Sequence, residues 1–267
     1  MAQDNYYSQE KHGPYALYDL GDFPLEDGGV ISNCQIAYST FGTLNANKDN
    51  AILITTWYSG TSKIMEQVYM GSGRAIDPAR YFVVIVNQIG NGLSTSPQNA
   101  TQDYRGPRFP RVRVSDDVRA QHRLLTEYFG IESLALVTGG SMGAQQTWEW
   151  VVRFPEMVKR AAPIAGTVRN TLHNFLFIET FMLALRDDPA WNNGYYAEPG
   201  AVSQGLCRHA DLWSVLGFSP EFINQQLYKI SASHLWKISV LVLRRVTFCP
   251  WIQTISYAWR GNGSITT

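Results

Sequence analysis

Acidic side chains are absent from the end of this chain. The 267 residues contain 22 Asp and Glu against 22 Lys and Arg, yet no acid lies beyond Glu221, while Lys229, Lys237 and Arg260 remain there. Any chemistry that needs a carboxylate must therefore take it from the first 221 residues. Because the rest of the chain is well supplied with acids, we expect residues 231–267 to be an atypical tail.

Charges and cysteines are also few. Charged residues make up 16% of the chain, below the usual quarter, and the net charge is zero. A neutral chain has no electrostatic attraction for nucleic acid or an anionic membrane, so neither partner is expected. The cysteines, Cys34, Cys207 and Cys249, are odd in number and widely separated. We expect no disulfide framework, no metal site, and a reducing, cytoplasmic location.

Long apolar runs are missing as well. The longest candidate, residues 238–243, is far too short to cross a bilayer, and residues 1–15 are polar and lack the apolar core of a signal peptide. The sequence therefore favours a protein with neither a membrane span nor a leader.

Short apolar runs alternate with helical patterns along the first 169 residues. Such runs are typical of parallel strands that are covered on both faces. We expect strands at residues 51–56, 81–86, 134–137 and 161–165. One helix should begin at Ser115 as N-cap and stop near Gly130, and another should cover residues 143–154. The fold class is α/β, with a mostly parallel sheet.

The chain then changes character. Apolar helical stretches at 175–185 and 212–227 flank a polar loop at 191–196, with no convincing strand between them. We expect residues 1–169 to form the α/β core and residues 170–230 to form a helical cap. The glycine-rich and proline-rich residues 90–110 form a long loop, and loops of this length often line sites.

One motif carries chemistry. Gly139-Gly140-Ser141-Met142-Gly143 matches G-x-S-x-G between an expected strand and an expected helix. This is the sequence context of a nucleophile elbow, in which the serine hydroxyl projects above the strand ends. The backbone N–H of Met142 would stabilise an oxyanion there. The second donor should follow the earlier central strand, where Tyr58 is the candidate through its backbone N–H.

The motif and its surroundings resemble the homoserine O-acetyltransferase-like branch of the α/β-hydrolase superfamily. The resemblance covers roughly residues 20–230 and is carried by residues 56–60, 71–78, 87–97, 118–125 and 139–143. It implies an α/β-hydrolase fold in which Ser141 is acylated by an ester or by acetyl-CoA and passes the acyl group to water or an alcohol. Acyl-CoA would then be a co-substrate, and no bound cofactor is expected.

Two departures from that branch matter. Met182 falls where the homoserine enzymes carry a cap arginine suited to the substrate carboxylate, and methionine cannot make that contact. The late acid and histidine of the triad are not recognisable, which predicts a truncated or altered chain after about residue 230. The remaining order-compatible set is Asp211 or Glu221 with His234, whereas His173 and His209 are expected in the cap.

Three functions therefore stay open. The first is serine-dependent acyl transfer or ester hydrolysis on a small-molecule ester or acyl substrate. The second is a catalytically inactive member that acts as a binding protein or is a degenerate product. The third is homoserine O-acetyltransferase using acetyl-CoA. A sheet cut short at its late strands would expose an edge, so we also expect self-association into a homo-oligomer or poor solubility.

Overall fold

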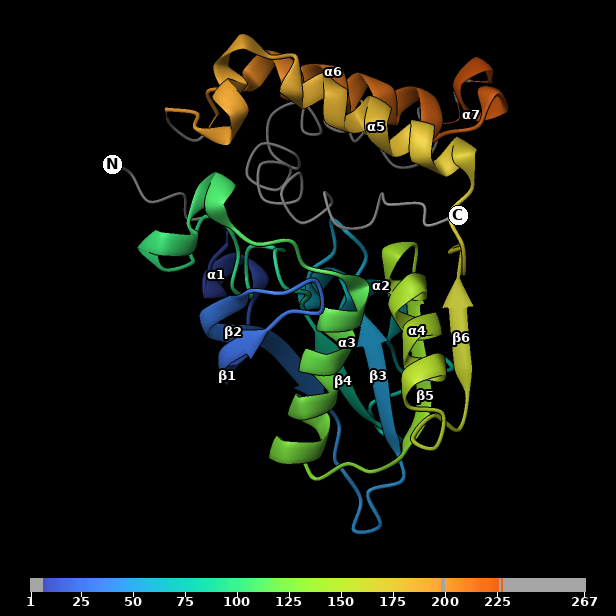
Figure 1. Ribbon diagram of the computed structural model, residues 1–267. Helices are drawn as coiled ribbons and strands as arrows, with labels where there is room; N and C mark the ends of the chain where they lie inside the picture. The colour runs from blue at the N-terminus through green and yellow to red at the C-terminus, as the bar shows by residue number, and fades with distance from the viewer. Residues whose placement is uncertain (1–6, 198–199, 226, 228–267) are drawn as a thin grey trace. The chain divides into compact units, whose positions relative to one another are not determined.

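The computed structural model describes residues 7–197, 200–225 and 227 (Figure 1). These residues divide into two compact units, one built around a β-sheet and ending at Arg169, and one made of helices from Asn170 onward. We call them the sheet unit and the helical unit. The expected tail, residues 231–267, lies outside the described residues.

The sheet unit contains a six-stranded sheet in the order β1-β2-β4-β3-β5-β6. Its strands are β1 (Ala16–Pro24), β2 (Val30–Phe41), β3 (Ala51–Thr55), β4 (Phe82–Val86), β5 (Leu134–Gly140) and β6 (Ala161–Ile164). The last four strands are parallel to one another, and β1 and β2 add an antiparallel hairpin beside β4. The α/β class and the mostly parallel sheet are thus as predicted.

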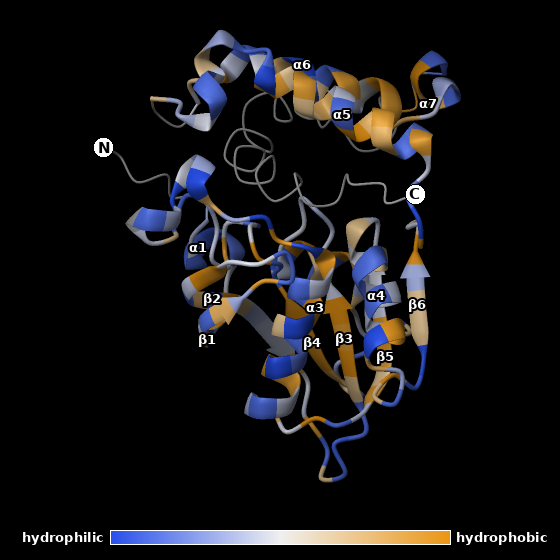
Figure 2. Cartoon of the chain, viewed as in Figure 1, coloured by the Kyte–Doolittle hydropathy of each residue, from blue (hydrophilic) through white to orange (hydrophobic). Residues whose placement is uncertain are grey.

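The four expected parallel strands form because their residues are apolar on both faces. All residues of β3 and β4 are buried, and alternate side chains enter two separate cores. One core contains Leu53, Val84 and the side chains of helices α3 (Val114–Arg123) and α4 (Met142–Arg153). The other contains Ile52, Ile54 and Met65 of α2 (Ser62–Tyr69). The strongly hydrophobic central strands stand out in Figure 2.

The start of α3 differs from the prediction. Arg113, not Ser115, is the N-cap, and the helix begins at Val114. Asp116 lies at the third position of the helix. Its Oδ2 accepts a hydrogen bond from the backbone N–H of Arg113 at 2.9 Å, so Asp116 and not Ser115 supplies the capping side chain. After Arg123 the helix continues as a π-helical turn, Leu124–Tyr128, and the chain turns at Gly130 with φ of 62°. The expected stop near Gly130 is confirmed.

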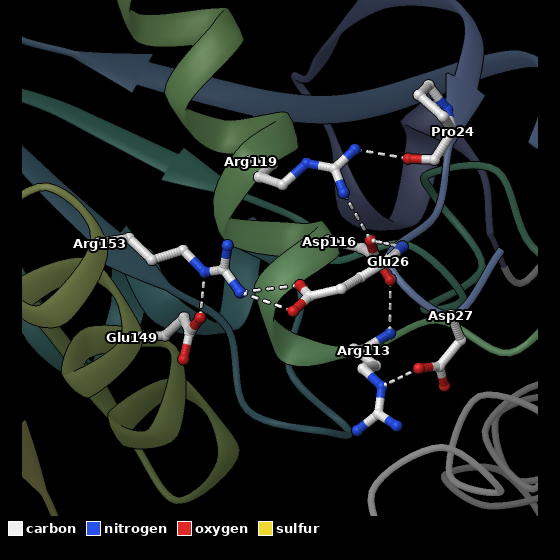
Figure 3. Close-up of polar contacts among 8 residues, drawn as sticks. All are labelled: Pro24, Glu26, Asp27, Arg113, Asp116, Arg119, Glu149 and Arg153. Carbon is white, nitrogen blue, oxygen red and sulfur yellow. Dashed lines mark hydrogen bonds and ion pairs between the residues drawn. The ribbon is translucent and has the colours of Figure 1, made fainter.

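A polar cluster ties the end of β1 to α3 and α4 (Figure 3). Asp116 Oδ1 accepts from the Glu26 backbone N–H at 2.9 Å and pairs with Arg119 at 3.1 Å. Arg153 of α4 donates to both carboxylate oxygens of Glu26, at 2.9 and 2.8 Å, and also pairs with Glu149. Asp116 is buried, so this cluster fastens the β1–β2 connection to the helices from inside the protein.

The helical unit contains α5 (Leu172–Arg186), α6 (Ser203–Leu216) and the short α7 (Pro220–Asn224). The first expected stretch is confirmed. The second, residues 212–227, contains the end of α6 and all of α7, but α6 begins earlier, at Ser203. The first half of α6 has a mostly polar sequence, although the side chains of Leu206 and His209 are buried. Phe181 of α5 packs against Trp213 of α6 with ring centroids 4.9 Å apart. The expected role of this unit as a cap stays a prediction.

Candidate active site

Ser141 sits on a strained turn between β5 and α4. The strand ends at Gly140, the helix begins at Met142, and Ser141 between them has φ of 55° and ψ of −119°. Non-glycine residues rarely adopt this region, and strain of this kind clusters at functional sites. The Ser141 backbone N–H donates to the Ile164 carbonyl at 2.9 Å, and the residue is exposed. The predicted tight turn between a strand and a helix at Ser141 is confirmed, and its role as nucleophile stays a prediction.

The flanking glycines are needed because neighbouring backbone lies against them. A Cβ on Gly139 would meet Thr55 Oγ1 at 2.1 Å and the Gly143 carbonyl carbon at 2.8 Å. A Cβ on Gly143 would meet the Thr55 carbonyl oxygen at 2.7 Å. Thr55 fills this space productively, since its hydroxyl donates to the Gly143 carbonyl at 2.7 Å. The elbow and the end of β3 are therefore locked together.

The loop after β3 lies beside the elbow. Thr55 pairs in register with Gly139 of β5, so the chain leaves both strands at the same edge of the sheet. Tyr58 and Ser59 are the central residues of a turn closed by the Gly60 N–H and the Trp57 carbonyl at 2.9 Å. Tyr58 and Met142, the two expected oxyanion donors, thus follow adjacent parallel strands. Met142 also opens a 12-residue helix, whose N-terminus carries partial positive charge.

Asparagine side chains that were not singled out in the sequence hold this loop. Asn87 follows β4, and its Oδ1 accepts from the Ser62 backbone N–H at 2.9 Å, while Asn91 donates to the Gly60 carbonyl at 3.3 Å. Ser94 in turn donates to the Asn87 carbonyl at 2.7 Å. All three are buried. The sequence signal for these residues was a run of polar residues directly after a buried strand. Their buried side chains hold the Tyr58 loop in place through hydrogen bonds.

The expected acids and Ser141 belong to different units. Asp211 is exposed on α6, and Glu221 is exposed in the first turn of α7, so both belong to the helical unit while Ser141 belongs to the sheet unit. His234 lies outside the described residues. The set of Asp211 or Glu221 with His234 stays a prediction.

The other histidines occupy defined surroundings. His209 on α6 has Nδ1 3.2 Å from the Phe181 carbonyl and Nε2 3.1 Å from the Trp213 indole nitrogen. A carbonyl only accepts and an indole only donates, so His209 is neutral with its proton on Nδ1. Burial lowers its pKa to about 4. Both ring nitrogens are engaged, which leaves His209 a structural residue.

His122 and His12 lie in the sheet unit. His122 stacks on Phe154 with ring centroids 3.9 Å apart, which indicates a structural role. His12 was not singled out from the sequence, yet its Nδ1 lies 3.2 Å from the hydroxyl of Thr61, which caps α2 next to the Tyr58 loop. Burial and the nearby Lys11 lower the pKa of His12. A lone histidine among polar residues near the N-terminus gives no sequence signal of this placement.

Within residues 7–197, 200–225 and 227, no group of three or more His, Cys, Asp or Glu side chains is placed to hold a metal ion. Among the helices of those same residues, none has both the length and the apolar character needed to span a bilayer.

Comparison with known proteins defines the family. Residues 58–218 match the model of the alpha/beta hydrolase fold family. An ethyl acetate hydrolase of Pseudomonas veronii is 52% identical over 266 residues, which cover 98% of this chain and 76% of that protein. The crystal structure of an acetylester hydrolase from Corynebacterium glutamicum has a TM-score of 0.92 and 45% identity, over all of this chain and 77% of that one. The chain therefore belongs to the α/β-hydrolase family.

The expected branch needs a correction. A homoserine O-acetyltransferase of Caulobacter vibrioides is 38% identical over 191 residues, covering 66% of this chain and half of that enzyme. The esterases are more similar and align over much more of the chain. The chain is thus closer to esterases than to homoserine acetyltransferases.

Proposed function

We propose that this chain hydrolyses small acyl esters, acetate esters above all, through an acyl-enzyme on Ser141. The observation that carries the proposal is the strained, exposed Ser141 at the junction of β5 and α4, with φ of 55° and ψ of −119°. The likeness to an ethyl acetate hydrolase and an acetylester hydrolase supports acetate as the acyl group. The same relatives favour water over homoserine as the acceptor.

The proposed ester hydrolysis has two steps, acylation and deacylation of Ser141. In the first, the Ser141 oxygen attacks the ester carbonyl and its proton passes to the leaving alkoxide, so that an alcohol departs and Ser141 carries the acyl group. In the second, water attacks this new ester, one proton of that water passes to the Ser141 oxygen, and the carboxylic acid is released. A general base must move the proton in both steps, and His234 with Asp211 or Glu221 remains our candidate set for that role.

Negative charge forms on the carbonyl oxygen in both steps. The backbone N–H groups of Met142 and Tyr58 are our candidates to stabilise it, because they follow adjacent strands and α4 directs its positive N-terminus to the same place. Removing one such donor from a serine hydrolase typically lowers kcat by roughly a hundredfold to a thousandfold. The oxyanion hole is therefore expected to contribute much of the rate.

The test is fluorophosphonate labelling together with hydrolysis of p-nitrophenyl acetate, comparing the full chain with Ser141→Ala. Ser72→Ala is a matched control, since Ser72 also follows a glycine but is exposed in a turn outside the elbow. We expect labelling and turnover in the wild type and in Ser72→Ala, and neither in Ser141→Ala. Mass spectrometry of the acetylated intermediate should place the acetyl group on the peptide that contains Ser141.

Two other outcomes would replace the proposal. A folded wild type that neither labels nor turns over ester would support the inactive family member, since the elbow would then lack a working base. Acetyl transfer from acetyl-CoA to homoserine, faster than hydrolysis, would support the acetyltransferase. We expect this transfer to be weak, because Met182 is buried on α5 and presents a thioether where a guanidinium would be needed.

A further inference from the structure

A chain of buried hydrogen bonds runs from α4 back to the loop that carries Tyr58. The Trp150 indole N–H donates to Gln121 Oε1 at 2.7 Å, and Gln121 Nε2 donates to Gln146 Oε1 at 2.6 Å. Gln146 Nε2 donates to the Thr56 carbonyl at 3.0 Å and to Gln88 Oε1 at 3.1 Å. Every one of these residues is at most 3% exposed.

The donor-to-acceptor direction of this series of hydrogen bonds is fixed at its Trp150 end. An indole N–H can only donate, so Gln121 must turn its oxygen toward Trp150 and its NH₂ group toward Gln146. Gln146 must then present its oxygen to Gln121, which leaves both of its N–H bonds for Thr56 and Gln88. A flipped Gln146 amide would place its oxygen against two acceptors in a site that water does not reach, so the observed orientation is strongly favoured.

Gln146 joins the two halves of the proposed oxyanion hole. It lies one helical turn after Met142 on α4, and it bonds to Thr56, two residues before Tyr58. The hydroxyl of Thr55 makes a second link, to the Gly143 carbonyl at 2.7 Å. An oxyanion hole works only when both donors lie within about 2.7–3.1 Å of one oxygen atom, so the spacing of α4 from this loop matters for the rate.

We propose that Gln146 is a positioning residue for acyl transfer, which sets the spacing of the Tyr58 and Met142 backbone N–H groups through its bond to Thr56. This inference rests on the proposed function of Ser141. The orientation of the Gln146 amide is in turn set by Trp150 through Gln121. A misplacement of about 1 Å can lower a rate about a hundredfold, so loss of the Thr56 bond acts on catalysis without touching substrate.

The test compares Gln146→Leu and Trp150→Phe with Val118→Ala. Leucine keeps most of the volume and removes both donors, and phenylalanine removes the indole N–H at the far end. Val118 is fully buried in the same core but outside the hydrogen-bond chain, so it controls for lost stability alone. For Gln146→Leu we expect kcat to fall roughly tenfold to a hundredfold with KM unchanged. Trp150→Phe should show a smaller fall, and Val118→Ala no change in kcat.

Hydrogen exchange of the peptide spanning residues 56–61 separates this inference from the proposed function. We expect faster exchange there in Gln146→Leu than in Val118→Ala, whether or not the wild type turns over ester. Unchanged exchange in that peptide, or a fall in kcat equal to that of Val118→Ala, overturns the inference. A wild type without Ser141-dependent turnover overturns the proposed function, and the exchange measurement alone then decides whether Gln146 holds the loop.

Discussion

The sheet unit and the helical unit handle polar groups in different ways. The sheet unit buries many of them and connects them, as in the chain from Trp150 to Thr56 and in the asparagine support of the Tyr58 loop. In its described part, the helical unit buries only two polar side chains, Asp188 and His209, and packs mainly through apolar contacts around Phe181 and Trp213. It leaves Leu172 and Val215 at least 70% exposed. A buried polar network has one low-energy arrangement, whereas apolar packing tolerates several.

This difference indicates where precision is needed. The reacting groups of a hydrolase must be held to fractions of an ångström, and connected amides and hydroxyls can do this. We therefore expect small changes in the sheet unit to have larger effects than comparable changes in the helical unit.

The largest expected effect is that of Gly139→Ala. Its Cβ would lie 2.1 Å from Thr55 Oγ1 and 2.8 Å from the backbone of Gly143, so β3, β5 and α4 would have to separate. We expect a loss of about 4 kcal/mol in the free energy of unfolding, measured by urea denaturation. Gly73→Ala is the control, because its φ of 73° is strained but nothing lies within 4 Å, and it should lose only about 1 kcal/mol. Equal losses would contradict the importance of close packing at the elbow.

The next effect concerns Asp116, which joins α3 to the β1–β2 connection. Asp116→Ala removes one buried carboxylate and leaves the Arg113 and Glu26 N–H groups without their acceptor. We expect a loss of about 3 kcal/mol in the free energy of unfolding. Lys63→Ala removes a surface pair with Glu66 at 2.9 Å and should cost about 0.5 kcal/mol or less. A similar cost for both variants would remove the distinction between buried and surface pairs.

The smallest effect tests the helical unit through pH. The His209 ring has a pKa near 4 when folded and about 6.5 when unfolded, so the unfolded state binds more protons between these values. The free energy of unfolding should therefore fall by about 2 kcal/mol between about pH 7 and pH 5. His209→Gln should flatten this slope, and His173→Gln, at an exposed position of α5, should keep it. An unchanged slope in His209→Gln would show that another group controls the acid sensitivity.

Much of the sheet unit could be predicted because its signals are local. Continuous apolar runs gave β3 to β6, and the G-x-S-x-G motif placed Ser141 at the elbow. The β1–β2 hairpin was not found, because its side chains alternate between exposed and buried and its register is interrupted around Gly21. The true cap of α3 was missed because the Asp116 carboxylate serves Arg113 and Glu26 together, and Glu26 is distant in sequence.

The candidate site was predictable to a smaller extent. Tyr58 and Met142 follow from the order of strands, which a motif can indicate. Gln146, Gln121 and Asn87 do not, because their roles depend on which backbone atoms they meet after folding, and glutamine and asparagine are common on surfaces. The acid and base could not be fixed from the sequence, since Asp211 and Glu221 lie in the helical unit and His234 lies outside the described residues.

The backbone strain at Ser141 lowers the free energy of unfolding whether or not a substrate is bound. A non-glycine residue in this conformation loses about 1–3 kcal/mol relative to a relaxed one, out of a typical total of 5–15 kcal/mol. Glycine at the same position would relieve this strain, so the fold would be more stable without its serine. A lineage that no longer used the hydroxyl would gain from losing it. The proposed nucleophilic role of Ser141 therefore lowers the stability of the fold, and Ser141→Gly should unfold at a higher urea concentration than the wild type.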